Sequence, residues 1–326
     1  MAGLAGALVL LGLCALASLA IGSQSIPLGV VLDALTDPDQ SDAHVIVRDL
    51  RVPRTELGLL VGGALGAAGA LMQGTMRNAL AEPGILGINA GAGFAVVLAI
   101  TLLGISSVTA YTGFALAGAA ASAVAVFGLG ATGREGPNAV RLALAGAVMA
   151  WLLTSLTSAV LVFDAQTLDQ FRFWIVGSLA GRDAGVVVAV LPVLAAGLVI
   201  AFGAGRSLNA LALGDEVARS LGQRVTLARS AACVGFVLLA GGAVAAAGPV
   251  AFVGLVVPHL ARGVAGADYR WIVPYSVVLG AALLLASDVL GRMIARPAEL
   301  SVGIVTALLG APFFIWLVRR RQLITL

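Results

Sequence analysis

Residues 185–204 read GVVVAVLPVLAAGLVIAFGA, a stretch of 20 residues without a charged side chain. A helix of about 20 apolar residues is long enough to cross the roughly 30 Å hydrocarbon core of a bilayer. Inside that core the backbone amides must bond to one another, which a helix achieves within a single segment. The stretch therefore predicts a membrane-spanning α-helix.

Similar apolar runs occur along the rest of the chain. Together with 185–204 they predict an all-α, polytopic membrane protein with about ten transmembrane helices in a single domain, residues 1–326. We expect the run at 2–22 to be a retained first helix, because it lacks the basic segment of a signal peptide and many spans follow it. The amphipathic segment 167–180 is too short and too polar to cross. The other expected spans are 56–76, 84–104, 108–131, 139–163, 226–247, 250–263, 271–291 and 301–318.

The composition supports the same class of protein. Apolar residues make up 60% of the chain and charged residues only 11%, whereas soluble domains carry about 25% charged residues. The 42 glycines suit helices that approach one another closely in lipid. All 19 basic residues are Arg, and they exceed the acidic residues by only three, so no nucleic-acid partner is expected.

The distribution of arginines predicts the orientation in the membrane. If the N-terminus is cytoplasmic, 12 of the 19 arginines fall on the cytoplasmic side, as the positive-inside rule requires. Both termini are then cytoplasmic, loop 23–53 lies outside, and loop 205–225 lies inside as short helices. The 12 cytoplasmic arginines are Arg77, Arg134, Arg141, Arg206, Arg219, Arg224, Arg229, Arg262, Arg270, Arg319, Arg320 and Arg321.

Three segments carry information beyond hydropathy. The first is RVPRT at 51–55, with GALMQG at 69–74 and RNALAEPGILGINAG at 77–91. The second is LALGDEVARSLG at 211–222. The third is GPVAFVGLVVPHLAR at 248–262, with PAELSVGIVTALLGAPFF at 297–314. Together these segments closely resemble the FecCD-type permeases, which import iron–siderophore, haem and cobalamin, and the resemblance extends from about residue 45 to the end of the chain.

The resemblance implies a multi-pass permease of the bacterial inner (plasma) membrane, with the inverted-repeat fold of a type II ATP-binding-cassette importer. The spans on either side of 185–204, four before it and four after, would form the two repeats. It also implies four partner subunits in the importer: a second permease, identical or paralogous, two cytoplasmic ATPases and an external substrate-binding protein. The chain has no Walker A motif, so we expect no enzymatic activity and no cofactor on this chain. ATP and magnesium would bind to the partner ATPases.

The expected cargo is a ferric siderophore or a related metal chelate. Cobalamin and haem remain the alternatives within the same family. An ion-coupled secondary transporter is the alternative from another class, and it would need carboxylates in mid-membrane. Only Asp288 meets that requirement.

Segment 207–223 is expected to form cytoplasmic coupling helices that contact an ATPase. Glu216, Ala218 and Gly222 match the Glu-Ala-Ala-x-x-x-Gly loop of importer permeases, with Val217 in place of its second residue. Ala218 and Gly222 are four residues apart and would give a helix face small enough to enter a groove. The alternative is an ordinary amphipathic loop. The predicted coupling residues are Leu213, Gly214, Asp215, Glu216, Ala218, Arg219, Leu221 and Gly222.

The resemblance also implies that arginines at the outer face meet acidic residues of the binding protein. Arg51, Arg54 and Arg296 are the candidates, since each adjoins a proline-stiffened segment and the guanidinium can hold a carboxylate with two hydrogen bonds. The alternative is that each lies beside lipid headgroups. Arg54 can instead pair internally, with Glu56 or a neighbouring helix, and Arg292 can take the place of Arg296.

Gln73 and Asn89 are the candidates for the translocation pathway, because polar side chains are rare in or beside membrane spans. The alternative is that they bond across helices. Asp288 and Arg292 are four residues apart and can pair. No metal site is expected, because His259 has no second ligand at suitable spacing.

Overall fold

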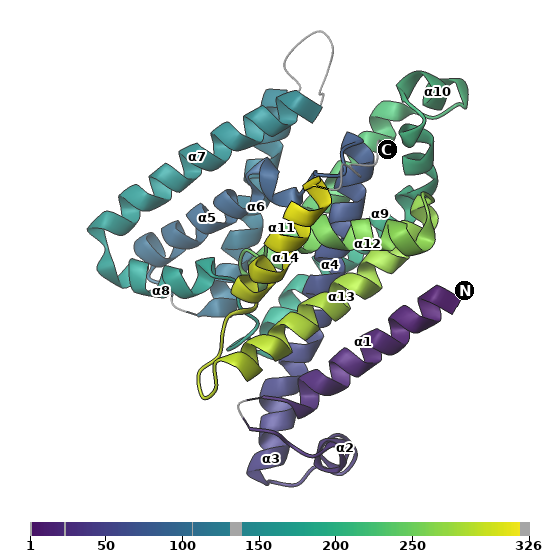
Figure 1. The fold of residues 1–326 in the computed structure, drawn as a ribbon. Coiled ribbons are helices and arrows are strands. Elements are labelled where there is room, and N and C mark those ends of the chain that lie inside the picture. Colours follow the sequence, from purple (N-terminus) through teal and green to yellow (C-terminus); the bar gives the residue numbers. More distant parts are fainter. Residues whose placement is uncertain (1, 23, 106, 131–138, 320–326) are drawn as a thin grey trace.

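The computed structural model describes residues 2–22, 24–105, 107–130 and 139–319, and these residues form helices without any strand. Ten helices correspond to the expected spans (Figure 1), which confirms the all-α, polytopic prediction. Seven of the apolar segments are long enough to cross a membrane, and α5, α12 and α14 are shorter. The ten are α1 (Ala2–Ala20), α4 (Val52–Met76), α5 (Ile88–Leu103), α6 (Val108–Gly130), α7 (Ala139–Phe163), α9 (Ala184–Ala212), α11 (Val225–Ala247), α12 (Val253–Ala265), α13 (Tyr269–Ile294) and α14 (Val302–Arg319).

Short helices lie at the two ends of this bundle. α2 (Leu28–Thr36), α3 (Asp42–Val45) and a π-helical turn (Ile46–Arg51) occupy the loop after α1, and α8 (Ala165–Ile175) is the short segment that was not expected to cross. Figure 1 shows α2, α3 and α8 at one end and α10 (Asp215–Ser220) at the other. Arg134, Arg320 and Arg321, used in the orientation argument, lie outside the described residues, as does residue 131, the expected end of one span.

α4 forms the centre of the bundle. It packs against α9, α11, α12 and α13, and nearly all of its side chains beyond the first turn are buried. Small residues make this possible, because a Cβ atom added to Gly62 would collide with the carbonyl oxygen of Gly280, and one added to Gly66 with that of Ser276. α4 and α13 therefore touch backbone to backbone, which is how membrane helices gain dispersion contacts without a hydrophobic driving force.

The helices before and after α9 pack in corresponding ways. α4 packs on α13 as α11 packs on α6, α5 packs on α6 as α12 packs on α13, and α5 packs on α7 as α12 packs on α14. α4 and α11, the first helix of each set, also contact each other. This pattern is the one that two repeated four-helix units, α4–α7 and α11–α14, produce.

One of these helices, α12, begins inside the bundle after a non-helical segment. α12 has 13 residues and is about 20 Å long, too short to span a bilayer alone. Its residue Gly254 packs on Gly69, which lies about 10 Å along α4 from the end of that helix at Met76. The preceding segment 248–252 therefore lies at the depth of the helices, where irregular backbone is tolerated only if protein groups satisfy it.

Candidate functional site

Arg51 is buried at the junction of α1 and α4, and only 6% of it is exposed. Its guanidinium donates hydrogen bonds to the carbonyl oxygens of Leu19 (2.7 Å) and Gln24 (2.5 Å). The expectation that Arg51 is presented to a partner is therefore corrected. The Leu19 carbonyl belongs to the last turn of α1, where carbonyls lack a helical donor, and Gln24 lies in the loop that follows.

Arg54 is also engaged within the chain. Its Nη2 lies 2.8 Å from Asp288 Oδ1 and its Nη1 lies 2.7 Å from Glu299 Oε2. The structure thus supports the internal pairing of Arg54, with a neighbouring helix and the loop after it rather than with Glu56. This corrects the expectation that Arg54 faces a docking partner, because its fork already holds two carboxylates.

Asp288 and Arg292 form the predicted pair, with 2.9 Å between Asp288 Oδ2 and Arg292 Nη2. Both are almost completely buried, at 1% and 2% exposure. Arg292 also donates to the carbonyl oxygens of Ser18 (2.9 Å) and Ile21 (2.8 Å), at the end of α1. We call Arg54, Asp288, Arg292 and Glu299 the outer charge cluster. It joins α1, α4, α13 and the loop between α13 and α14.

Arg296 is the one member of the docking prediction that is presented to solvent. It is exposed in the loop between α13 and α14, and it has no ion-pair partner among the residues that the structure describes. Arg292 cannot replace it, because its guanidinium is buried in the outer charge cluster. Glu299, in the same loop, pairs with Arg54. This ion pair anchors the loop that carries Arg296 to α4.

At the opposite end, the turns around α10 expose an apolar face. Leu213, Val217 and Leu221 are 62%, 45% and 65% exposed. Val217 and Leu221 are four residues apart and lie on one side of α10 and its C-cap, and Leu213 is exposed just before α10, at the C-cap of α9. Glu216 and Arg219 are exposed beside them. We call Leu213, Val217 and Leu221 the inner apolar face.

The small face expected from Ala218 and Gly222 is not formed. Ala218 is completely buried, whereas Gly222 is exposed, and a Cβ atom added to it would meet no neighbour. Gly222 adopts a φ of 79° and Gly214 a φ of 101°, both favourable for glycine alone. These two glycines therefore shape the turns around α10, and the leucines and Val217 supply its outward surface.

Asp215 connects α10 with two membrane helices. Its carboxylate accepts two hydrogen bonds from Arg229 in α11, at 2.9 and 3.1 Å. Arg77, at the end of α4, lies 3.6 Å from the same carboxylate. Asp215 therefore links α10 to the ends of α4 and α11 through charged groups.

Hydrogen bonds also hold the end of α9 that precedes α10 against the start of α13. Asn209 in α9 donates to Asp268 Oδ1 (2.6 Å) and accepts from the backbone amide of Tyr269 (2.8 Å). Hydrogen bonds from Arg270 and Asn209 hold the pKa of Asp268 well below its usual range. Asp268 therefore stays ionised at neutral pH, as the N-cap of α13.

Neither residue predicted for the pathway lines either of the two hollows described below. Gln73 is fully buried and donates to the carbonyl oxygens of Gly254 and Leu255, both at 3.3 Å. It therefore bonds across helices, which was the alternative reading of this residue. Asn89 is half-buried at the start of α5.

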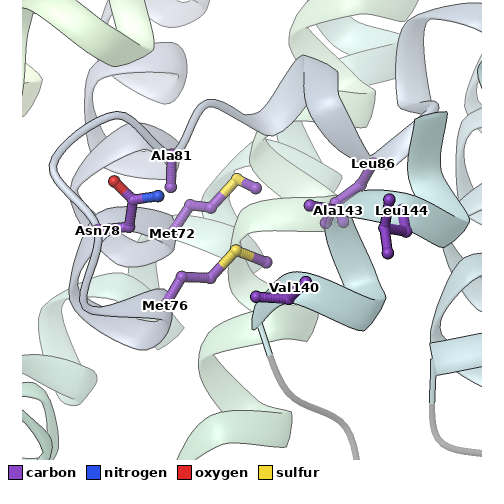
Figure 2. A pocket seen from close by; sticks show the side chains of 8 residues that line it. All are labelled: Met72, Met76, Asn78, Ala81, Leu86, Val140, Ala143 and Leu144. Atoms are coloured by element: carbon purple, nitrogen blue, oxygen red, sulfur yellow. The ribbon is translucent and has the colours of Figure 1, made fainter.

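A hollow of about 310 Å³ lies instead beside the end of α4. Met72 and Met76 extend from α4 into it, and Asn78 is its polar side chain (Figure 2). Flexible thioethers adapt to varied neighbours. The hollow is lined by Met72, Met76, Asn78, Ala81, Leu86, Val140, Ala143 and Leu144.

An open hollow of about 650 Å³ on α7 was missed by the sequence reasoning. Its lining residues are Trp151, Thr154, Ser155 and Ser158, and all four are exposed. The signal was available as four hydroxyl side chains within the five residues 154–158 of an otherwise apolar span. Hydroxyl groups facing outward from a span favour a neighbouring protein or an aqueous path over lipid.

Cysteine and metal chemistry add no further site. Cys14 and Cys233 are both free. Within the described residues, no group of three His, Cys, Asp or Glu side chains is placed to hold a metal ion.

A bundle of ten mostly apolar helices defines a polytopic membrane protein. Comparison with known proteins gives the family. The model of the FecCD transport family matches residues 9–320. The chain belongs to the FecCD transport family, and it is a transport permease rather than an enzyme.

Individual relatives match over nearly the full length. The ferric enterobactin transport system permease protein FepD of Escherichia coli is 45% identical over 317 residues, 97% of this chain and 94% of FepD. The probable siderophore transport system permease protein YfiZ of Bacillus subtilis is 44% identical over 290 residues, 89% of this chain and 87% of YfiZ. A solved structure of a putative metal-chelate type ABC transporter, in an inward-facing conformation, superposes with a TM-score of 0.84 at 28% identity, covering 97% of this chain and 98% of the other.

Proposed function

We propose that this permease carries a ferric siderophore inward as part of an ATP-driven importer. The observation that carries the proposal is the 45% identity to a permease named for ferric enterobactin, over 97% of the chain. A hemin transport permease of Yersinia pestis is 37% identical over a similar length. The higher identity to siderophore permeases favours a siderophore over haem.

The proposed assembly contains a second permease, two cytoplasmic ATPases and an external binding protein. The inner apolar face suits an ATPase groove, and the exposed Arg296 suits an acidic docking surface on the binding protein. The exposed hydroxyl groups of α7 suit a pathway shared with the second permease. The arginine distribution supports cytoplasmic termini, with α10 inside and Arg296 outside.

Uptake by the complete importer tests the cargo. A strain that lacks its own siderophore, haem and cobalamin importers would express the complete system and receive each compound in labelled form. We expect ATP-dependent uptake of a ferric siderophore and none of haem or cobalamin. Uptake of haem or cobalamin alone would contradict the proposed cargo, and uptake that persists with inactive ATPases would contradict the class.

The outer docking surface gives a separate prediction. Arg296→Glu places a negative charge where the binding protein is expected to present carboxylates. We expect binding to weaken by about tenfold at low ionic strength, since repulsion replaces a pair worth up to about 1 kcal/mol. The difference should shrink at high salt because exposed charges are screened. Binding of the purified binding protein to the permease at two salt concentrations measures this.

Arg296→Gln is the matched control, because it removes the positive charge without adding repulsion. Its binding should fall between the wild-type and Arg296→Glu values. Equal affinity of all three proteins at low salt would remove Arg296 from the docking surface.

A further inference from the structure

The start of α12 is held by a side chain from a distant part of the chain. Phe252 is the N-cap of α12, and its own side chain makes no capping hydrogen bond. Glu82, 170 residues earlier, accepts a hydrogen bond from the Phe252 backbone amide at 2.9 Å. An amide in this position has no partner within its own helix, so Glu82 supplies the acceptor that α12 lacks.

A second backbone group in the same turn is satisfied from the same region. Pro258 has no N–H, so the carbonyl oxygen of Gly254, four residues earlier, loses its usual helical donor. Gln73 donates to this oxygen at 3.3 Å and to that of Leu255 at 3.3 Å. The α4–α5 region therefore contributes one acceptor and one donor to the first turn of α12.

The turn is also confined by close packing. A Cβ atom added to Gly310 of α14 would collide with the Phe252 side chain, and one added to Gly69 of α4 would collide with the Gly254 backbone. Phe252 itself adopts a φ of 68°, which costs a residue other than glycine about 1 kcal/mol or more. A residue held in this way lies at the junction of α4, α12 and α14.

We propose that Glu82 is a positioning residue of the transport cycle, which caps α12 from the α4–α5 segment and sets how α12 and α14 are held on α4. This rests on the proposed function, since it assigns a role within alternating access. Hinges form at element ends, where a few residues absorb the change in φ and ψ. A cap that belongs to another segment can release and re-form without unwinding the helix that it caps.

Glu82 contributes a hydrogen-bond acceptor and a negative charge, and two substitutions separate these contributions. The carboxylate is an acceptor, and its negative charge also favours the N-terminus of α12. Glu82→Gln keeps an acceptor oxygen at similar reach but removes the charge. Glu82→Ala removes both and leaves the half-buried Phe252 amide without its partner, which costs more than removing the donor and the acceptor together.

Coupling between ATP hydrolysis and uptake provides the test. The complete importer is reconstituted in proteoliposomes, and both rates are measured for whichever chelate the wild-type importer takes up. We expect Glu82→Ala to lower uptake about tenfold relative to ATP hydrolysis, and Glu82→Gln to keep most of it. Glu56→Ala, at an exposed glutamate of α4, is the matched control and should couple normally.

The outcomes are distinct. Normal coupling in Glu82→Ala would overturn the proposal, and so would a defect in Glu82→Gln as large as that of Glu82→Ala. If Glu82→Ala does not assemble, Gln73→Leu carries the test, because it removes the second tie to the same turn. Uncoupling in that variant supports the proposal, and a lower unfolding temperature with normal coupling overturns it. An unexpected cargo would contradict the proposed substrate and leave this test intact.

Discussion

Replacing Leu221 by Asp is expected to abolish ATP-driven uptake while the permease remains folded and inserted. Leu221 is 65% exposed, so the substitution leaves no cavity in the protein itself. Within a contact to the ATPase, however, the new carboxylate would lose its water without gaining a partner, at a cost of about 3 kcal/mol or more. That corresponds to a loss of affinity of over about 100-fold.

Co-purification of the ATPase with the permease, together with uptake in cells, measures this effect. Leu35→Asp is the matched control, because Leu35 is also exposed, at 48%, but lies in α2 at the opposite end of the bundle. It should retain the ATPase and transport normally. Retention of the ATPase by Leu221→Asp would show that the inner apolar face is not the docking surface.

The second large effect is expected from Asp288→Ala. Asp288 is 1% exposed and lies between Arg54 and Arg292. Its removal leaves two poorly solvated guanidinium groups with one carboxylate, that of Glu299, in contact with Arg54 alone. Breaking a buried ion pair by removing one partner costs about 3–5 kcal/mol. We expect a clear drop in the unfolding temperature of the detergent-solubilised protein and in its amount in the membrane.

Ser287→Ala provides the comparison for this variant. Ser287 precedes Asp288 in α13, is fully buried, and its hydroxyl has no hydrogen-bond partner within the described part of the chain. Its substitution should therefore change the unfolding temperature little. If the two variants were equally stable, the outer charge cluster would contribute little to the fold.

The spans could be predicted because each is encoded locally. A run of apolar residues such as 185–204 defines its helix without reference to the rest of the chain. The pair of Asp288 and Arg292 was accessible for the same reason, since both lie four residues apart in one helix. The expected span 185–204 was still too short, because α9 continues to Ala212.

The roles of individual polar residues could not be predicted in the same way. Arg54 forms a hydrogen bond with Asp288, which lies 234 residues later in the sequence, and Gln73 forms one with Gly254, which lies 181 residues later. Hydropathy and spacing carry no information about such partners, so Arg51 was expected at the surface, and the internal bonds of Arg54 and Gln73 were foreseen only as alternatives, without the partners that the structure shows. Pro258 held a usable signal, because the carbonyl oxygen that it leaves free requires a donor from another segment.

Ala218 illustrates a different limit. A match to a motif gives the positions of residues along the chain but not the rotation of the helix that carries them. The spacing of Val217 and Leu221 within α10 and its C-cap gives the outward side of that short helix. That spacing, together with the structure, places Ala218 inward.

The central place of α4 has a consequence for biosynthesis. The chain is made from its N-terminus, so α4, which ends at Met76, leaves the ribosome long before the helices that surround it. Its neighbours α9, α11, α12 and α13 begin only at Ala184 and end at Ile294. More than half of the protein must therefore be synthesised while the glycine-rich surface of α4 faces lipid or the insertion machinery. Final assembly around this helix is a late event in the life of the nascent chain.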